Sequence, residues 1–401
     1  MTTVAAGSVC AVITWRAGVV VGLGTSWPGA AELTLRLEHA DARLPDEQPQ
    51  TQPVTLPDEV RALAYPELVG PVAVGDRLLL NVSALARGLG TGGYALVVGQ
   101  ADRLPADAPA GPGHLVKARY TPLQAMVLGV DDQESPHHDA LRDADDLTGM
   151  PVVVADLHSA LPAVVAGARY AAALAGRSAP KVAYVMTDGG ALPAWFSRTV
   201  AGLRDAGWIE VCVTTGQAFG GDLEAVTVHT GLLAARTVVG ADLVVVAQGP
   251  GNLGTGTRWG FSGVAAGEAV NAAATLSGRP VASLRVSGAD ARERHLGVSH
   301  HSMTAYGRVA LAPADVVVPV FEPDPDGGLD ALGRRVQHQV AALAAPHGRH
   351  RLVDVEAGAD LLSALAGSPV RLSTMGRGLE QDPAAFLAAA VAGVHAARLA
   401  G

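Results

Sequence analysis

Acidic and imidazole side chains recur in this sequence directly after short apolar segments. Asp156 and His158 follow the first such segment, Asp188 follows the second, and the adjacent His300 and His301 come after the fifth. A carboxylate beside an imidazole can orient a general base or supply two metal ligands. We therefore take these five residues as candidate catalytic residues.

Each candidate also has an ordinary structural interpretation. Asp156 and His158 are two residues apart, so both could lie on one side of an extended strand end; equally, Asp156 could cap the following helix. Asp188 precedes two glycines, where an Asx turn is common. Neighbouring residues project in different directions, so we expect at most one of His300 and His301 to enter a pocket with the acids. Asp156, His158, Asp188 and that histidine could ligate a metal, but no spacing matches a metal signature, so the sequence names no metal and no cofactor.

A glycine-rich string follows the fourth apolar segment and fits the pattern G-x-G-x-x-G. Glycine lets a backbone approach a phosphate closely, and free N–H groups at a helix start favour an anion. As a dinucleotide fingerprint the string is poor, because it follows the fourth strand and no acidic residue ends the next one. The alternative is a tight turn that lets helix and sheet pack closely. The candidate anion-binding residues here are Gly249, Gly251, Asn252, Gly254, Thr255, Gly256 and Thr257.

Three cations could neutralise a bound anion. Lys117 and Arg119 alternate along the chain, which places both on one face of an extended segment. Arg377 lies in a Met-Gly-Arg-Gly loop near the C-terminus. The alternative for the first two is an ion pair between domains.

The elements that must position these residues alternate between strand and helix from Pro151 onwards. Strands that are apolar throughout imply burial on both faces, as in a parallel sheet covered by helices. The pattern predicts a doubly wound, mostly parallel, Rossmann-like α/β domain over residues 151–401. The strands expected in it are Pro151–Asp156, Lys181–Thr187, Glu210–Thr214, Asp242–Ala247, Pro280–Val286, Asp315–Val320 and Leu352–Val355. The helices are Leu161–Ala175, Ala194–Ala206, Asp222–Val239, Gly263–Leu276, Leu329–Ala345 and Ala384–Leu399.

Residues 1–105 show short β-branched runs with little helical periodicity, which predicts a small β-barrel-like domain. A stretch rich in Pro, Ala and Gly follows, so we assign residues 106–150 to a linker and connecting strand. The expected N-terminal strands are Val9–Thr14, Val19–Leu23, Leu33–Glu38, Val72–Val74, Arg77–Val82 and Tyr94–Val98.

Composition limits the partners of this 401-residue chain. Lys and Arg number 29 against 38 Asp and Glu, and the formal charge of −9 repels nucleic acid. No uncharged apolar run reaches the ~18 residues of a membrane span. Two cysteines, and no basic residue before Arg16, indicate a reducing cytoplasm and no signal peptide. A homodimer is the ordinary expectation for a soluble protein.

The sequence resembles a bacterial family of uncharacterised proteins, the domain-of-unknown-function family 3866, over about residues 8 to 398. The resemblance implies that its matching strings form the family signature, and they coincide with the loops discussed above. It implies no activity. The matching strings are Gly113-His-Leu-Val-Lys-Ala-Arg-Tyr-Thr-Pro122, Leu157-His-Ser159, Tyr184-Val-Met-Thr-Asp-Gly-Gly-Ala-Leu-Pro193, Gly249-Pro-Gly, Gly254-Thr-Gly-Thr257, Gly297-Val-Ser-His-His301 and Ser373-Thr-Met-Gly-Arg-Gly378.

These observations favour an enzyme, a hydrolase or transferase, acting on an anionic, phosphorylated or nucleotide-like small molecule. Its site would lie at the carboxyl edge of the parallel strands, where ligands of such sheets bind. The alternative is a non-catalytic ligand sensor or an assembly scaffold.

Overall fold

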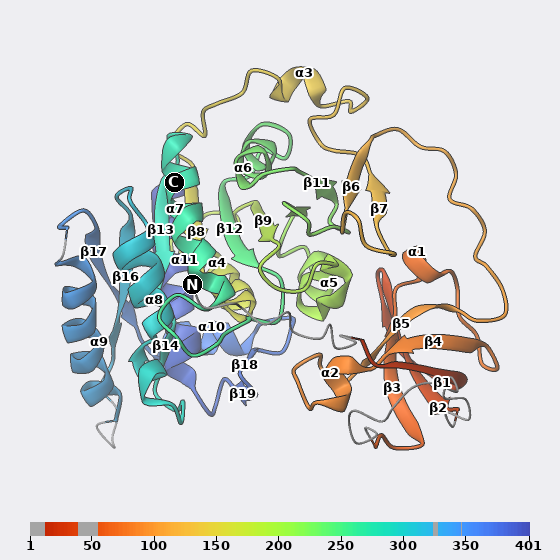
Figure 1. Ribbon diagram of the computed structural model, residues 1–401. Coiled ribbons are helices and arrows are strands. Elements are labelled where there is room, and N and C mark those ends of the chain that lie inside the picture. The colour runs from red at the N-terminus through yellow and green to blue at the C-terminus, as the bar shows by residue number, and fades with distance from the viewer. Residues whose placement is uncertain (1–12, 39–54, 324–327, 346) are drawn as a thin grey trace, which may run out of the picture. The chain divides into compact units, whose positions relative to one another are not determined.

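The computed structural model describes residues 13–38, 55–323, 328–345 and 347–401, and it divides into two compact units (Figure 1). The first unit is Met1–Ala110 and the second is Gly111–Gly401. Each unit has its own hydrophobic core.

The first unit is a closed five-stranded barrel, which confirms the predicted barrel-like fold. Strands β3 and β5 run parallel and the other pairs run antiparallel, a Greek-key connectivity found in small barrels. Short helices α1 (Pro66–Val69) and α2 (Ser83–Ala86) connect its strands. The strands, in barrel order, are β1 (Trp15–Trp27), β2 (Ala30–Leu37), β3 (Glu59–Ala64), β5 (Ala95–Gln100) and β4 (Arg77–Asn81).

Two details of the barrel differ from the sequence expectation. Strand β3 was not expected, and Val72–Val74 forms no strand but leads into a turn at Asp76. The expected Val9–Thr14 strand lies largely outside the described residues.

The second unit is built on an eight-stranded sheet in which every neighbouring pair is parallel. The central strands are buried along their whole length, as in a sheet covered on both faces. This confirms the doubly wound α/β prediction. In spatial order the strands are β11 (Leu223–Glu224), β10 (Val211–Thr214), β9 (Val182–Thr187), β12 (Leu243–Gln248), β8 (Pro151–Val154), β13 (Arg279–Ser283), β16 (Asp315–Phe321) and β17 (Arg351–Ala357).

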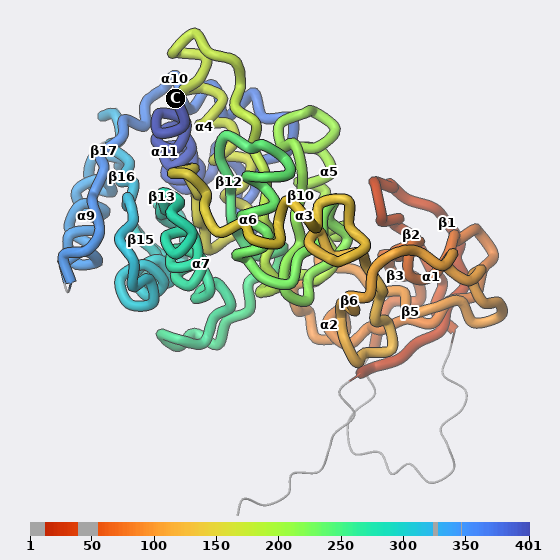
Figure 2. Tube along the Cα trace, turned by 90° about the horizontal axis from the view of Figure 1, so that it is seen from above, coloured from red at the N-terminus to blue at the C-terminus, as the bar shows by residue number. Residues whose placement is uncertain are grey.

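Helices cover both faces of this sheet. Figure 2 shows α4, α10 and α11 on one side of the strands and α6 and α7 on the other, in agreement with their contacts. Helix α6 begins later than predicted, because β11 occupies the first residues of the expected helix, and α10 was not predicted. The α-helices of the second unit are α3 (His138–Leu141), α4 (Leu161–Leu174), α5 (Arg198–Asp205), α6 (Val228–Thr237), α7 (Ala265–Thr275), α8 (His300–Thr304), α9 (Gly328–Ala344), α10 (Ala359–Ala366) and α11 (Pro383–Ala400).

Helix α11 forms the centre of its layer and packs closely on α4. A Cβ atom at Gly167 would lie 2.0 Å from the Ala390 carbonyl oxygen, and one at Gly393 would lie 1.8 Å from that of Val164. Glycine at both positions therefore lets the two backbones touch. Among the described helices, α11 alone is long and apolar enough to cross a membrane, but 72% of it is buried inside the protein, as expected of a core helix.

Strand β8 lies where the chain changes direction across the sheet. Helix α4, which follows β8, covers one face, while α7, which follows the adjacent β12, covers the other. Chain segments therefore diverge at the carboxyl end of β8, the place in a doubly wound sheet where ligands bind. Asp156 follows β8 at this point.

Candidate functional site

Three histidines form a cluster beside the carboxyl end of β8. His295 ends the short turn η4 (Glu293–His295), and His300 and His301 begin α8. One ring nitrogen of each lies within 4.8 Å of one ring nitrogen of each other. Of the two adjacent histidines, His301 lies beside Asp156, while His300 lines a separate cleft that has no acidic residue in its lining. The His295 ring lies 4.9 Å from one and 5.1 Å from the other, so it contacts both despite their different directions.

The surroundings of His295 and His300 disfavour the charged form of both imidazoles. Burial, together with the nearby Arg285 charge, lowers the pKa of His295 to about 3. Burial, with the neighbouring His301, lowers the pKa of His300 to about 4. Neutral imidazoles can act as metal ligands or proton acceptors.

Buried contacts fix the cluster against the sheet. After α8 the chain continues as a π-helical turn, η5 (Ala305–Val309), whose Tyr306 hydroxyl bonds the carbonyl oxygens of Val154 (2.8 Å) and Ser283 (3.1 Å). These two carbonyls end β8 and β13, so α8 is tied to both strands. The Phe261 ring stacks on His301 at 3.8 Å.

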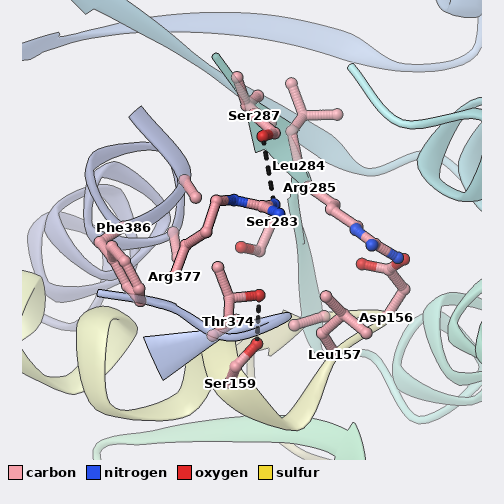
Figure 3. A pocket seen from close by; sticks show the side chains of 15 residues that line it. Asp156, Leu157, Ser159, Ser283, Leu284, Arg285, Ser287, Thr374, Arg377 and Phe386 are labelled. Carbon is pink, nitrogen blue, oxygen red and sulfur yellow. Dashed lines mark hydrogen bonds between the residues drawn. The ribbon is translucent and has the colours of Figure 1, made fainter. Parts of the chain in front are cut away.

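Asp156 and Arg285 lie next to the cluster. Asp156 is 2% exposed, and its Oδ2 is 3.5 Å from Nδ1 of His301. The Arg285 guanidinium lies 3.1 Å from the same nitrogen, and Figure 3 shows it reaching toward the Asp156 carboxylate. Burial lowers the pKa of Arg285, and the Asp156 charge opposes that shift. Both side chains line a cavity of about 30 Å³, room for about one water.

Unpaired polar atoms concentrate at this edge of the sheet. Within the described part of the chain, six buried side-chain nitrogens or oxygens lack a hydrogen-bond partner, and four lie here: Asp156 Oδ2, Gln248 Oε1, Asn252 Nδ2 and His300 Nε2. Gln248 donates to the Asp156 carbonyl at 3.3 Å. A Cβ at Gly263 would lie 2.9 Å from the same carbonyl oxygen and 3.3 Å from Nδ2 of Asn252. A buried polar atom without a partner costs stability, so such a group marks a place for water, an ion or a ligand.

A cleft of about 500 Å³ opens beside the histidine cluster and is lined by cations; we call it the arginine cleft. Arg258, Arg294 and Arg308 reach it from three separate segments, and His300 lies in its wall. None of the three arginine side chains forms an ion pair or hydrogen bond with the residues that the structure describes. Its volume suits a small-molecule ligand.

The residues of the glycine-rich string lie in different places, some packed against the backbone and some at the arginine cleft. Gly249 lies against the backbone of Ala191, where a Cβ would come within 2.4 Å of its carbonyl oxygen. Gly256, at a φ of 77°, lines the arginine cleft. The string does not open a helix directly, since α7 begins only at Ala265. Gly251, Gly254, Thr255 and Thr257 are exposed, and Thr255 and Thr257 contact each other through their hydroxyls at 3.1 Å.

His158 points away from Asp156. Strand β8 ends at Val154, so the alternation that would align the two side chains stops before them. His158 Nδ1 contacts the Tyr184 hydroxyl at 2.9 Å, and Nε2 contacts the Ser197 hydroxyl at 2.7 Å. Burial lowers the pKa of His158 to about 4. Both ring nitrogens are thus used by internal partners.

Asp188 and Lys117 lie together near β10 and β11, away from the histidine cluster in the strand order. Lys117 belongs to β6 (Leu115–Lys117) and is 2% exposed. Its Nζ donates to the carbonyls of Ala218 (3.0 Å) and Ala225 (2.8 Å) and lies 3.6 Å from Glu224. We call Lys117 and Glu224 the lysine pair; it lies within the second unit.

Burial acts on both members of the lysine pair. It lowers the pKa of Lys117 and raises that of Glu224, and their mutual attraction opposes both shifts. Nearby, Asp188 accepts from the Gln217 amide at 2.9 Å, and Gln217 accepts from the Arg119 amide, also at 2.9 Å. The Arg119 guanidinium lies over the Tyr120 ring.

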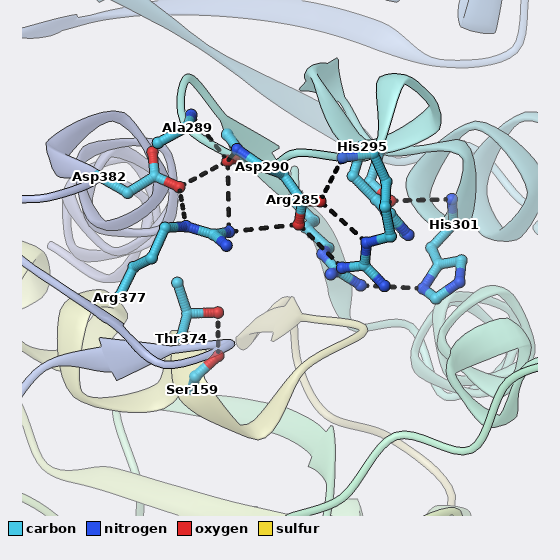
Figure 4. Close-up of polar contacts among 12 residues, drawn as sticks. Ser159, Arg285, Ala289, Asp290, His295, His301, Thr374, Arg377 and Asp382 are labelled. Carbon is cyan, nitrogen blue, oxygen red and sulfur yellow. Dashed lines mark hydrogen bonds and ion pairs between the residues drawn. The ribbon is translucent and has the colours of Figure 1, made fainter.

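Arg377 is held by two buried carboxylates (Figure 4). It lies 3.1 Å from Asp382 and 3.3 Å from Asp290, and Asp290 also binds Arg292 through two contacts of 2.9 Å. The Arg292 hydrogen bonds hold the pKa of Asp290 well below its usual range. Arg377 therefore joins the C-terminal loop to the turn after β14 (Val286–Ser287).

Several residues of this site were not predicted from the sequence. His295 carried a signal, because its spacing to His300 and His301 places three imidazoles within seven residues. Arg285 follows β13 as Asp156 follows β8, so its strand-end position was also visible. Arg258, Arg294 and Arg308 carried none, since single arginines in loops are common and only the fold brings them together.

Fold and site together define a two-unit protein, a small barrel and a doubly wound α/β unit with a polar crevice at the central strand. A family model described as protein of unknown function (DUF3866) matches residues 61–393, so the chain belongs to this family. No curated protein and no solved structure matches the chain.

Proposed function

We propose that the protein is a hydrolase or transferase acting on a small, phosphorylated molecule. The phosphate would bind in the arginine cleft, with its reacting bond directed toward the histidine cluster and Asp156. The proposal places the reaction in the cytoplasm, where reduced cysteines and phosphorylated metabolites are found.

One observation carries the proposal. Three arginines without partners among the described residues line one cleft with His300, on a chain whose formal charge is −9. Positive charge gathered in one concave place on an acidic protein attracts anions there. Arginine binds phosphate oxygens through paired N–H donors, which makes it well suited to this ligand.

The Asp156–His301 pair supports the chemistry. A water, or an acceptor hydroxyl in the transferase case, would lose a proton to His301 while its oxygen bonds to phosphorus. The bond from phosphorus to the leaving oxygen breaks, and His301 returns the proton to that oxygen. Asp156 would orient the ring and stabilise its charged form, while the arginines offset charge on the phosphoryl oxygens.

The test uses the whole chain with inorganic phosphate and a panel of sugar phosphates and nucleoside monophosphates. We expect at least one of them to raise the melting temperature. Arg308→Ala should weaken its binding by about tenfold or more, as for a lost hydrogen bond to a charged group. The matched control is Arg236→Ala, an exposed arginine on α6 outside the cleft, which removes the same charge and should leave binding unchanged.

Turnover then separates the two functions considered. Release of phosphate that is lost in Asp156→Asn supports the enzyme. Stabilisation without turnover of any compound in the panel favours the sensor instead. Equal binding by wild type and Arg308→Ala would overturn the arginine cleft as the ligand site.

A further inference from the structure

We propose that His295, His300 and His301 together bind one divalent transition-metal ion of the zinc class. The inference deepens the proposed function and rests on it for its catalytic part. With a metal on its Nε2, His301 would be a ligand and no longer the base, and the metal would instead activate the attacking water by lowering its pKa. Binding of the metal can be measured alone.

The geometry suits a single ion. Three nitrogens bound to one zinc at about 2.0 Å and tetrahedral angles lie about 3.3 Å apart. The ring nitrogens of the cluster lie within 4.8 Å of one another, so modest ring rotations close the site. His295 and His301 are buried, and the three rings are in mutual contact.

Neighbouring groups select which nitrogen of each ring can bind. Nδ1 of His295 is bonded to the Ser299 hydroxyl at 2.8 Å, and Nδ1 of His301 faces Asp156 and Arg285. Nε2 of His300 is buried without a partner. These contacts leave Nε2 of all three rings for the ion. A hydroxyl or carboxylate bonded to the other ring nitrogen is the usual support of a metal-bound histidine.

Asp156 has a defined part in this arrangement. In the structure Arg285 lies at hydrogen-bond distance from Nδ1 of His301, and Oδ2 of Asp156, 3.5 Å from that nitrogen, has no hydrogen-bond partner. With a metal on Nε2, Nδ1 of His301 would carry the proton and donate it to Oδ2, and Arg285 would leave that nitrogen. The buried atom that now lacks a partner would then be satisfied.

The donor set points to a chemical class of metal. Three imidazoles favour Zn²⁺, Co²⁺ or Ni²⁺ over Mg²⁺ and Ca²⁺, which prefer oxygen ligands. Three protein ligands leave a fourth position open for water or substrate, as in catalytic zinc sites. His300 also lines the arginine cleft, so a substrate phosphate there would lie beside the ion.

The experiment uses the full chain without a polyhistidine tag, freed of metal by a chelator. Calorimetric titration with Zn²⁺ should give one equivalent per chain. Addition of Co²⁺ should produce the visible absorption of a four-coordinate cobalt site, a readout independent of activity.

Variants assign the site. His300→Ala and His301→Ala should abolish the stoichiometric binding, and Asp156→Asn should weaken it by about tenfold or more. His229→Ala, which removes an exposed histidine on α6, should bind as wild type does. Far-UV circular dichroism checks that each variant is folded, and Ser299→Ala offers a milder change to the same site. Absence of stoichiometric binding in wild type, or unchanged binding in folded His300→Ala and His301→Ala, would overturn the inference.

The outcome is separable from that of the proposed function. If the metal-free protein binds phosphate through Arg308 but takes up no Zn²⁺, the metal inference fails and the proposed function stands. If Zn²⁺ binds at the three histidines but no phosphorylated compound binds or reacts, the proposed function fails and the metal site stands.

Discussion

Two groups of polar side chains in the second unit differ in whether their atoms have hydrogen-bond partners. Around Lys117, Glu224 and His158, nearly every donor and acceptor is used inside the protein. Around Asp156 and His300, buried polar atoms remain unpaired. Both groups are rich in residues that could do chemistry, so residue type does not distinguish them. The presence of hydrogen-bond partners distinguishes them, because a paired group stabilises the fold and an unpaired one is available to a ligand.

The largest effect should come from breaking the lysine pair. Lys117→Met leaves Glu224 and two backbone carbonyls buried without their cation, so we expect a loss of about 3–5 kcal/mol in the free energy of unfolding. Urea unfolding measures it, and the double variant Lys117→Met/Glu224→Gln should recover part of the loss. A loss below about 1 kcal/mol would mean that Lys117 is not structural.

The next effect concerns the carboxylates around Arg377 and depends on pH. Asp290 has a lowered pKa in the folded state, so its stabilising contribution is complete above about pH 4 and is lost as the pH falls further. Asp290→Asn should therefore cost about 2–3 kcal/mol at neutral pH, and less near pH 3. Chemical denaturation of both proteins across this range tests it; a gap that does not change with pH would contradict the assignment.

A smaller loss is expected at His158. His158→Ala removes two hydrogen bonds, to Tyr184 and Ser197, and should cost about 1–2 kcal/mol of stability. Binding of Zn²⁺ and of phosphate should not change, because the ring faces neither the histidine cluster nor the arginine cleft. Loss of Zn²⁺ or phosphate binding in a folded His158→Ala protein would show that His158 belongs to the ligand site, and would contradict the distinction between the two groups of side chains.

The smallest effect should come from an unpaired group. Gln248→Met keeps the side-chain length, removes the partnerless Oε1 and gives up one 3.3 Å bond to the Asp156 carbonyl. We expect stability to change by less than about 1 kcal/mol in thermal unfolding. A loss above about 2 kcal/mol would show that Gln248 supports the fold as the lysine pair does.

Periodicity and turn residues predicted the class of both units, because apolar strands and their spacing reflect burial on both faces of a sheet. They also placed Asp156, His300 and His301 after the correct strands. Strand ends were less predictable. We expected the first strand to reach Asp156, but β8 ends at Val154, and Asp156 and His158 therefore contact different neighbours.

The arginine cleft and the unpaired atoms could not be predicted in the same way. Arg258, Arg294 and Arg308 come together through the loop after β12, the turn η4 and the π-helical turn η5, and no local pattern encodes that meeting. Whether Asp188 or Asp156 keeps a free oxygen depends on single contacts across the sheet, such as the Gln217 amide that binds Asp188.

A crystal structure grown with Zn²⁺ and phosphate, with anomalous data collected at the zinc edge, tests the central claim most directly. We predict one zinc peak among His295, His300 and His301, and phosphate contacted by Arg258, Arg294 or Arg308. Zinc or phosphate bound instead beside Asp188 and Gln217, with the histidine cluster and the arginine cleft empty, would contradict it.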